Sequence, residues 1–481
     1  MPRLRLLLTV WTGSVTIEIL PDDVLLPIFY FDGLEDVDPL HPSWHRLVHV
    51  CRRWRSVVFA SPNFLDLRLV CGPGTRVELT NIWPPLPIII RSPIDWPMPD
   101  YYDFNAAIVH RSRVREIDLR LSSNWQLRRL ASAMQEPFPA LKRLKLEAFF
   151  EGYSLPVLSD GLFGGSFPHL QSLEFRSISF PALPKLLLSA SDLVDLTLWE
   201  IPDSGYILPE SLVTCLAVMA NLKSLTVETR SSPAFHPDWD RHHLLPSTRT
   251  VLPSLTHFEF LWISKYLEDL VARIDAPLLD SVNITLLYEE TFNVSQLGEF
   301  MRRTRRFQAL NEAHVDFDPE GVMVTSTPPT QTVDKTSGFR ISSGYLSWDL
   351  SSLMQILTSL FSSICTVEHL YIYEPDVLLS DWEDAVQEVQ WPEIFLSFPF
   401  VKSLYLSKEI AQYLAPILQE LVHVEESATN VLPALEIVFL EDEPSGPVHE
   451  AIGLFIAARQ SSGHPVVASH WNRVRTPELY S

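Results

Sequence analysis

The residues from His236 to His243 form the densest group of potential metal ligands in the sequence. The stretch reads HPDWDRHH and contains three histidines and two aspartates, which are side chains that can bind a transition metal. Prolines bound this stretch, and no helical or strand pattern surrounds it to fix the ligand angles. We therefore expect a loop here and no bound metal.

The motifs that mark the common enzyme classes are missing. No G-x-S-x-G, Walker loop, H-E-x-x-H or G-x-G-x-x-G pattern occurs, and acidic pairs mean little in a chain with 59 acidic residues. We expect no enzymatic activity and no cofactor. A hydrolase with an appended repeat domain is a remote alternative.

The cysteines are scattered without a CxxC pair, which argues against a disulfide scaffold and a zinc module and favours the cytoplasm or nucleus; they are Cys51, Cys71, Cys215 and Cys365.

Composition limits the possible partners. The chain has 481 residues, of which 46% are hydrophobic, so it can bury a large core. Its formal charge of −22 repels phosphate, so we expect neither nucleic acid nor a membrane as a partner.

Arg3 and Arg5 precede a short leucine run as in a signal peptide, but no cleavage site follows. Residues 1–18 are expected to be a poorly ordered leader.

Two N-terminal segments have helical spacing. The first helix should begin at Pro21, and Pro27 should kink or shorten it. Its apolar stripe consists of Val24, Leu25, Ile28 and Phe29. The second segment is predicted to be a single amphipathic helix that ends near Ser61-Pro62, with apolar positions at Leu47, Val50, Cys51, Trp54, Val57 and Val58.

In this order, the stretches LPDDVLLPIF and VHVCRRWRSVVFASP resemble the two halves of the F-box motif. The resemblance implies a small all-α F-box module over residues 19–68, which docks a Skp-type adaptor and, through it, the cullin of a ubiquitin ligase. It also implies that Pro21, Leu25, Ile28 and Phe29 are buried against the adaptor. The full set of implied adaptor-binding residues is Leu20, Pro21, Val24, Leu25, Ile28, Phe29 and Trp54.

Residues 69–105 are predicted to be a linker and the entry into a second domain. Glycines and the run Trp-Pro-Pro-Leu-Pro indicate turns and polyproline II, followed by a short strand at Ile88 to Ile90. A connector between domains is favoured over a free PxxP ligand. With LVHVCRRWRSVVF upstream, this region looks like the large F-box families of mushroom-forming fungi.

The remaining chain repeats the pattern L-x-x-L-x-L with apolar substitutes, as in FPALKRLKLEAF, FPHLQSLEFRSI and FPFVKSLYLSKE. Such recurrence is typical of leucine-rich repeats. Most units lack the usual Asn or Cys, so the repeats should be irregular. Units are expected to begin at Val114, Leu141, Leu170, Leu193, Leu222, Leu255, Val367, Val401 and Leu435, with weaker ones at Leu279, Leu310 and around Phe339.

The predicted fold is therefore α/β: an F-box module, then an irregular leucine-rich-repeat solenoid over residues 106–470, with a parallel sheet and outer helices, and a tail over residues 471–481. Strand residues that alternate with the apolar ones should project from the sheet. The aromatic ones are candidates for holding a protein substrate, because rigid rings make good binding hot spots: Trp199, Tyr371, Tyr373 and Tyr405. The C-terminal tail could instead cover them.

Two charged runs are further candidates. MRRTRRFQAL, with Arg302, Arg303, Arg305 and Arg306, could bind an acidic partner, although a solvated helix end is favoured. The acidic stretch Glu374 to Phe395 could recruit a basic ligand, although an exposed amphipathic helix is favoured. Together these features predict a substrate receptor of a Skp–cullin–F-box ubiquitin ligase. The alternative is a ligase-independent scaffold whose N-terminal helices cap the solenoid.

Overall fold

The computed structural model describes residues 19–34, 44–72, 83–92, 108–149, 157–158, 161–229, 248–287, 295–309, 311–318, 321–327, 338–344, 367–373, 391–423, 431–441 and 446–471. The chain divides into two compact units, Met1–Phe150 and Glu151–Ser481, each of which is described by itself. The domain boundaries expected from the sequence stay a prediction.

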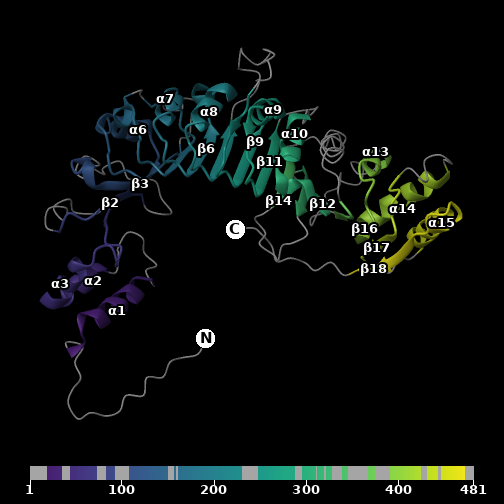
Figure 1. The fold of residues 1–481 in the computed structure, drawn as a ribbon, viewed down its shortest axis with the longest axis horizontal. Coiled ribbons are helices and arrows are strands. Elements are labelled where there is room, and N and C mark those ends of the chain that lie inside the picture. The colour runs from purple at the N-terminus through teal and green to yellow at the C-terminus, as the bar shows by residue number, and fades with distance from the viewer. Residues whose placement is uncertain are drawn as a thin grey trace, which may run out of the picture. The chain divides into compact units, whose positions relative to one another are not determined.

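The first unit opens with three helices, α1 (Asp22–Leu34), α2 (Trp44–Val50) and α3 (Arg52–Ala60), seen in Figure 1. α1 begins as predicted, because the amides of Val24 and Leu25 both donate to the carbonyl of Pro21 at 3.1 Å. The expected shortening at Pro27 is wrong, since α1 continues through it as one helix of 13 residues. Pro27 is exposed, so water can reach the carbonyl that lacks its helical donor.

The second amphipathic segment is two helices, and the prediction of a single helix is wrong. Cys51 separates them with an extended backbone, φ −154° and ψ 171°, and acts as the N-cap of α3. Its Sγ accepts a hydrogen bond from the amide of Trp54 at 3.4 Å. The apolar rhythm continues across the break, so spacing alone does not reveal it.

Four parallel strands follow in the first unit: β1 (Leu69–Cys71), β2 (Ile88–Arg91), β3 (Val114–Leu121) and β4 (Arg143–Ala148). β2 confirms the strand predicted at Ile88 to Ile90. A 3-10 turn, η2 (Arg111–Arg113), precedes β3, and α6 (Asn124–Ala133) follows it. Ser123 caps α6 by accepting a hydrogen bond from the amide of Gln126 at 3.3 Å.

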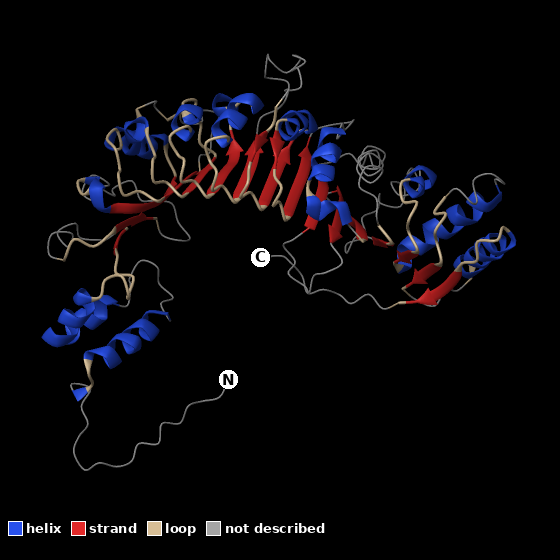
Figure 2. Cartoon of the chain, in the orientation of Figure 1, coloured by secondary structure: helices blue, strands red, loops and turns tan. Residues whose placement is uncertain are grey.

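The second unit begins with five neighbouring parallel strands: β5 (Ser172–Arg176), β6 (Asp195–Ile201), β7 (Ser224–Thr229), β9 (His257–Trp262) and β11 (Ser281–Leu287). Figure 2 shows the connecting helices on one side of these strands. These and other helical segments are η3 (Leu162–Gly165), α7 (Leu183–Leu187), η4 (Asp203–Gly205), α8 (Pro209–Leu216), α9 (Ser264–Ala272), α10 (Ser295–Arg303) and η6 (Arg305–Ala309). The short strands β8 (Thr250–Val251) and β10 (Ile274–Asp275) form a separate parallel pair.

An antiparallel meander interrupts the parallel order. It consists of β12 (Glu312–Asp318), β13 (Gly321–Thr327) and β14 (Gly338–Gly344). β14 pairs with β11, and β12 pairs with the next strand of the parallel series, β15 (His369–Tyr373). β13 therefore runs against all its neighbours, and no predicted repeat accounts for it.

The parallel series continues through β15, β16 (Ser403–Leu406), β17 (Ile437–Leu440) and β18 (Val467–His470). The helices α13 (Trp391–Leu396), α14 (Lys408–His423) and α15 (Pro447–Ser461) precede β16, β17 and β18 respectively. Most of these strands alternate between buried and more accessible residues, as in β7 and β15, whereas all four residues of β18 are exposed. We call the accessible side of the strands in the second unit the open face.

The core of the second unit consists of the apolar positions of the repeats. In the described repeats of this unit, the first apolar position is buried just before the strand, and the next two are buried on the strand. Buried examples are Leu170, Leu173 and Phe175, then Leu193, Leu196 and Leu198, and later Val401, Leu404 and Leu406. Burial of this apolar surface provides most of the favourable folding energy.

The prediction of a mixed α/β fold with a large parallel sheet and several helices is confirmed.

Candidate protein-interaction surfaces

The start of α1 is fixed to α3 by one arginine. Arg53 donates to the Asp22 carboxylate through Nε at 3.0 Å and through a terminal nitrogen at 2.6 Å, and also to the carbonyl of Leu20. Asp22 lies in the first turn of α1, where a carboxylate is favoured by the helix dipole. Because α2 also packs against α3 and α1, the three N-terminal helices form one packed module.

The residues implied to bind an adaptor separate into two groups. Leu25 and Phe29 are buried, and the ring of Phe29 packs against Trp54 with centroids 4.7 Å apart. Leu25 and Phe29 therefore pack the module itself and offer no surface for a partner. Leu20 and Trp54 are half-buried, whereas Pro21, Val24 and Ile28 are exposed.

A second apolar stripe lies on the exposed side of α1. Val24, Ile28 and Phe31 follow one another at the spacing of a single helix face, and 42%, 42% and 65% of their surfaces are exposed. We call these three residues the N-terminal apolar face. Sequence reasoning missed Phe31, although the interval from Ile28 to Phe31 continues the stripe. Spacing alone cannot show which of the two stripes on α1 faces inwards.

The Trp-Pro-Pro-Leu-Pro run is engaged within the first unit. The ring of Trp83 packs against Trp44 and Phe59, each with centroids 5.6 Å apart, and so joins α2 and α3 to the segment before β2. Arg113 donates to the carbonyls of Leu86 and Pro84 at 2.9 and 3.4 Å. These contacts support a structural connector over a free ligand.

Aromatic rings form a continuous row across the open face. His314, Tyr371, Tyr405 and Phe439 lie on β12, β15, β16 and β17, which are consecutive strands. Successive centroids are 4.4, 4.1 and 4.4 Å apart, with interplanar angles of 5°, 13° and 4°. We call these four residues the aromatic row. Two of them were predicted as substrate-binding residues.

The beginning of the tail lies against this row. Trp471 has ring centroids 6.1, 6.0 and 5.5 Å from those of Tyr371, Tyr373 and Tyr405. Its indole N–H donates to the carbonyl of Leu406 at 3.2 Å. The alternative that the tail covers the aromatic side chains is therefore supported for this one residue, because the structure describes none of residues 472–481.

Trp199 belongs to a different part of the open face. Six strands separate β6 from β15, so Trp199 lies roughly 34 Å from the tyrosines at the usual strand spacing. The guanidinium of Arg176 lies over its ring at 4.7 Å. Glu200 accepts a hydrogen bond from the Ser177 hydroxyl at 2.6 Å. The four predicted substrate-binding residues thus form a group of three and a separate tryptophan.

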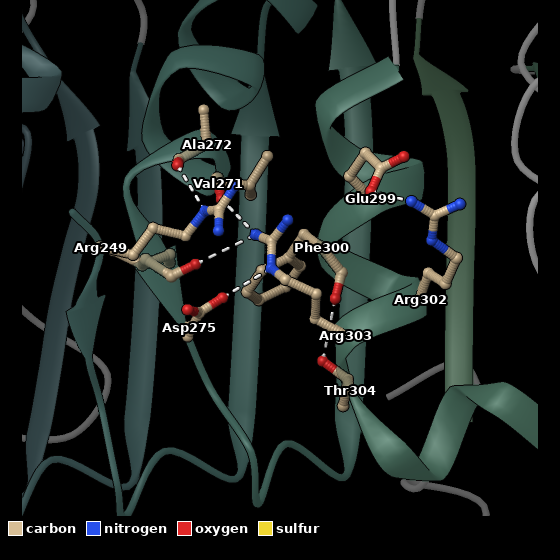
Figure 3. A network of polar contacts seen from close by, with 10 residues as sticks. Arg249, Val271, Ala272, Asp275, Glu299, Phe300, Arg302, Arg303 and Thr304 are labelled. Atoms are coloured by element: carbon tan, nitrogen blue, oxygen red, sulfur yellow. Dashed lines mark hydrogen bonds and ion pairs between the residues drawn. The ribbon is translucent and has the colours of Figure 1, made fainter. Parts of the chain in front are cut away.

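The arginine run is used largely inside the fold. Arg303 donates to Asp275 at 2.6 Å and to the carbonyls of Val271 and Ile274, near the end of α9. Figure 3 shows Arg303 directed towards Asp275 and Val271. Arg306 pairs with Asp280 at 2.5 Å. Arg302 forms an exposed pair with Glu299 one turn away. These contacts support a structural role for the run over the binding of an acidic partner.

Glu268 on α9 caps the start of the next helix, α10. It accepts hydrogen bonds from the amides of Gln296 and Leu297, at 2.7 and 2.8 Å, and from the Ser295 hydroxyl at 3.2 Å. Burial raises the pKa of Glu268 to about 7, although these three hydrogen bonds act in the opposite direction. α9 and α10 are therefore joined through a buried titratable group that sequence reasoning missed.

Several predicted features lie outside the described residues. These are the leader over residues 1–18, the HPDWDRHH stretch and most of the acidic stretch, of which the structure describes only residues 391–395, within α13. Across the parts that are described, no cluster of three or more His, Cys, Asp or Glu side chains could hold a metal ion. Within the same parts, every helix is too short or too polar to cross a membrane.

No family model matches the sequence. No curated protein matches it either.

Proposed function

We propose that this chain is the substrate-recognition subunit of a Skp–cullin–F-box ubiquitin ligase. The N-terminal helices dock a Skp-type adaptor, and the open face of the repeats holds the protein to be modified. The chain itself carries out no covalent step. It raises the effective concentration of substrate lysines near a bound conjugating enzyme.

The observation that carries the proposal is the N-terminal apolar face. Val24, Ile28 and Phe31 lie together on a helix whose other stripe already packs against α2 and α3. A contiguous exposed apolar patch on a packed module favours a protein partner. The residues around it match the F-box pattern in type and order, which gives this partner its proposed identity.

The open face supports the second half of the proposal. Its side chains project from strands that pack tightly on their other side, so a partner would meet a rigid surface. Aromatic side chains on such a surface provide contact area with little loss of conformational entropy. The open face alone can therefore bind a protein substrate, because such binding needs no metal ion.

Affinity purification of the full chain, followed by mass spectrometry, tests the proposal. We expect peptides of a Skp-type adaptor and a cullin in the purified material. Their absence under conditions that preserve known ligases would contradict the proposal and favour the ligase-independent scaffold.

A further inference from the structure

The indole of Trp471 occupies a defined place on the open face. The rings of Tyr371 and Tyr405 meet it edge to face, with interplanar angles of 65° and 78°, and Tyr373 meets it at 54°. Edge-to-face contact is a favourable arrangement of two aromatic rings. The carbonyl of Leu406 accepts the indole N–H at 3.2 Å. We call the three tyrosines and this carbonyl the indole site.

The walls of the indole site are supported without Trp471. The tyrosines lie on β15 and β16, which pair with each other in parallel. Tyr405 also stacks between Tyr371 and Phe439, with centroids 4.1 and 4.4 Å away. The carbonyl of the site accepts the amide of Glu441 at 3.1 Å as well, so it keeps a hydrogen bond when the indole leaves. A side chain from another protein can therefore make the same contacts.

Trp471 reaches the indole site from a strand with little burial. It follows β18, the last strand of the sheet, whose four residues are all exposed. Its amide donates to the carbonyl of Leu440 at 3.1 Å, which extends the pairing of β18 with β17 by one residue. Local opening costs least where few apolar contacts hold the chain. The indole can therefore leave the site at the end of an edge strand.

The chemistry of the indole site favours tryptophan. The three rings offer contact area to any aromatic side chain, but the carbonyl of Leu406 adds a hydrogen bond only for a side chain with a donor. An indole combines a large ring with an N–H donor, whereas a phenylalanine ring has no donor. Tryptophan is also among the residues that contribute most to protein interfaces.

We infer that the indole site binds a tryptophan side chain of the protein substrate, and that Trp471 occupies the site in the free chain as an internal competitor. The inference rests on the proposed function for the source of the tryptophan. It names a substrate class, proteins with an exposed tryptophan.

An internal competitor has an effect of characteristic sign. It lowers the apparent affinity by the fraction of chains in which the site is free. Removal of Trp471 should therefore tighten the binding of a tryptophan ligand. Removal of a residue that simply forms part of the binding surface would weaken it instead.

The test uses the full chain and two short acetylated, amidated peptides of sequence Gly-Ser-X-Ser-Gly, where X is Trp or Phe. Ligand-observed NMR titrations give their dissociation constants for the wild type, for Trp471→Ala and for the matched control Trp125→Ala. Trp125 is another accessible tryptophan, on α6 of the first unit, with 51% of its surface exposed.

We expect Trp471→Ala to bind the Trp peptide about tenfold more tightly than the wild type does. Trp125→Ala should stay within about twofold of the wild type. Unchanged or weaker binding by Trp471→Ala would overturn the inference, and so would an equal gain in the control.

The ligand preference is measured in Trp471→Ala, where the competitor is gone. The Trp peptide should bind about fivefold more tightly than the Phe peptide, because only the indole donates to Leu406. Adding Tyr405→Ala removes one wall and should weaken binding of the Trp peptide about fivefold or more. Equal binding of the two peptides, or no effect of Tyr405→Ala, would contradict the assignment of the site.

Circular dichroism checks that each variant folds. A milder variant, Trp471→Phe, keeps a ring next to β18 but lacks the N–H donor, so it is a weaker competitor. It should bind the Trp peptide about two- to threefold more tightly than the wild type. Should Trp471→Ala not fold, equal binding by Trp471→Phe and the wild type would overturn the inference.

These measurements use the chain without an adaptor, so a failure of the proposed ligase function leaves their readout intact. Conversely, a chain that binds an adaptor but shows no gain in Trp471→Ala would contradict only this inference.

Discussion

Neighbouring residues on one strand have opposite roles in the second unit. Leu404 on β16 is completely buried, whereas Tyr405 beside it lies between Tyr371 and Phe439 in the aromatic row. The same alternation recurs on β7 and β15. Substitutions at adjacent positions should therefore have separable effects on stability and on binding.

This contrast can be measured with Leu404→Ala and Tyr405→Ala. The leucine variant opens a cavity and should lower the free energy of unfolding by about 2 to 5 kcal/mol. The tyrosine variant loses its ring contacts with Tyr371, Phe439 and Trp471 and should lower it by about 1 to 2 kcal/mol, while weakening substrate capture. Urea unfolding measures both. An equal loss in the two variants would place Tyr405 in the core.

Glu268 predicts a pH dependence of stability. Because burial raises the pKa of Glu268 from 4.5 to about 7, the folded protein retains this proton in a range where the unfolded chain releases it. The stability that comes from the proton is complete below pH 4.5 and is lost as the pH rises through about 7. The loss is at most about 3 kcal/mol.

Glu268→Gln should remove this component, because glutamine does not titrate but keeps an acceptor for the α10 amides. Unfolding midpoints measured across this pH range give the difference between the two proteins. We expect the wild type to lose stability relative to the variant as the pH rises. Parallel curves would show that Glu268 does not titrate there.

At the scale of the elements, α9 and α10 stabilise each other at both ends. Glu268 caps the start of α10, and Arg303 from the end of α10 donates to carbonyls at the end of α9. Unpaired backbone groups at helix ends are costly when they are buried. The two helices should therefore unfold together.

Arg303→Ala tests this coupling, and Arg302→Ala is its matched control. Loss of Arg303 leaves Asp275 and two carbonyls without their donor and should cost about 1 to 3 kcal/mol. Arg302 forms an exposed pair, so its loss should cost less than about 1 kcal/mol. Hydrogen exchange of α9 should increase only in Arg303→Ala. Similar behaviour of the two variants would contradict the coupling.

The repeat strands were predictable, because each buries a pattern of apolar residues that alternates with polar ones. The break at Cys51 was not, because the residues on both sides of it contribute to one apolar stripe. β13 was missed for another reason. It has no L-x-x-L-x-L pattern. A repeat template also assumes that neighbouring strands are parallel, whereas β13 is antiparallel to both of its neighbours, β12 and β14.

At the scale of the whole molecule, the candidate sites were only partly predictable. The grouping of Tyr371, Tyr373 and Tyr405 follows from neighbouring repeats, but the distance to Trp199 depends on the number of intervening strands, which includes the unpredicted β13. The docking residues depend on which stripe of α1 packs inwards. That choice is made by tertiary contacts such as Phe29 with Trp54, which local spacing does not specify.

The central claim is that the N-terminal apolar face docks a Skp-type adaptor. Its most direct test is the dissociation constant of the full chain with a purified adaptor, measured for the wild type, for Val24→Asp plus Ile28→Asp, and for the control Leu454→Asp on α15. Leu454 is similarly exposed, at 48%. We predict that the wild type and the control bind alike and that the double variant binds at least about a hundredfold more weakly, because a charge buried in an interface is costly. Failure of the wild type to bind, or equal binding by the double variant, would contradict the account.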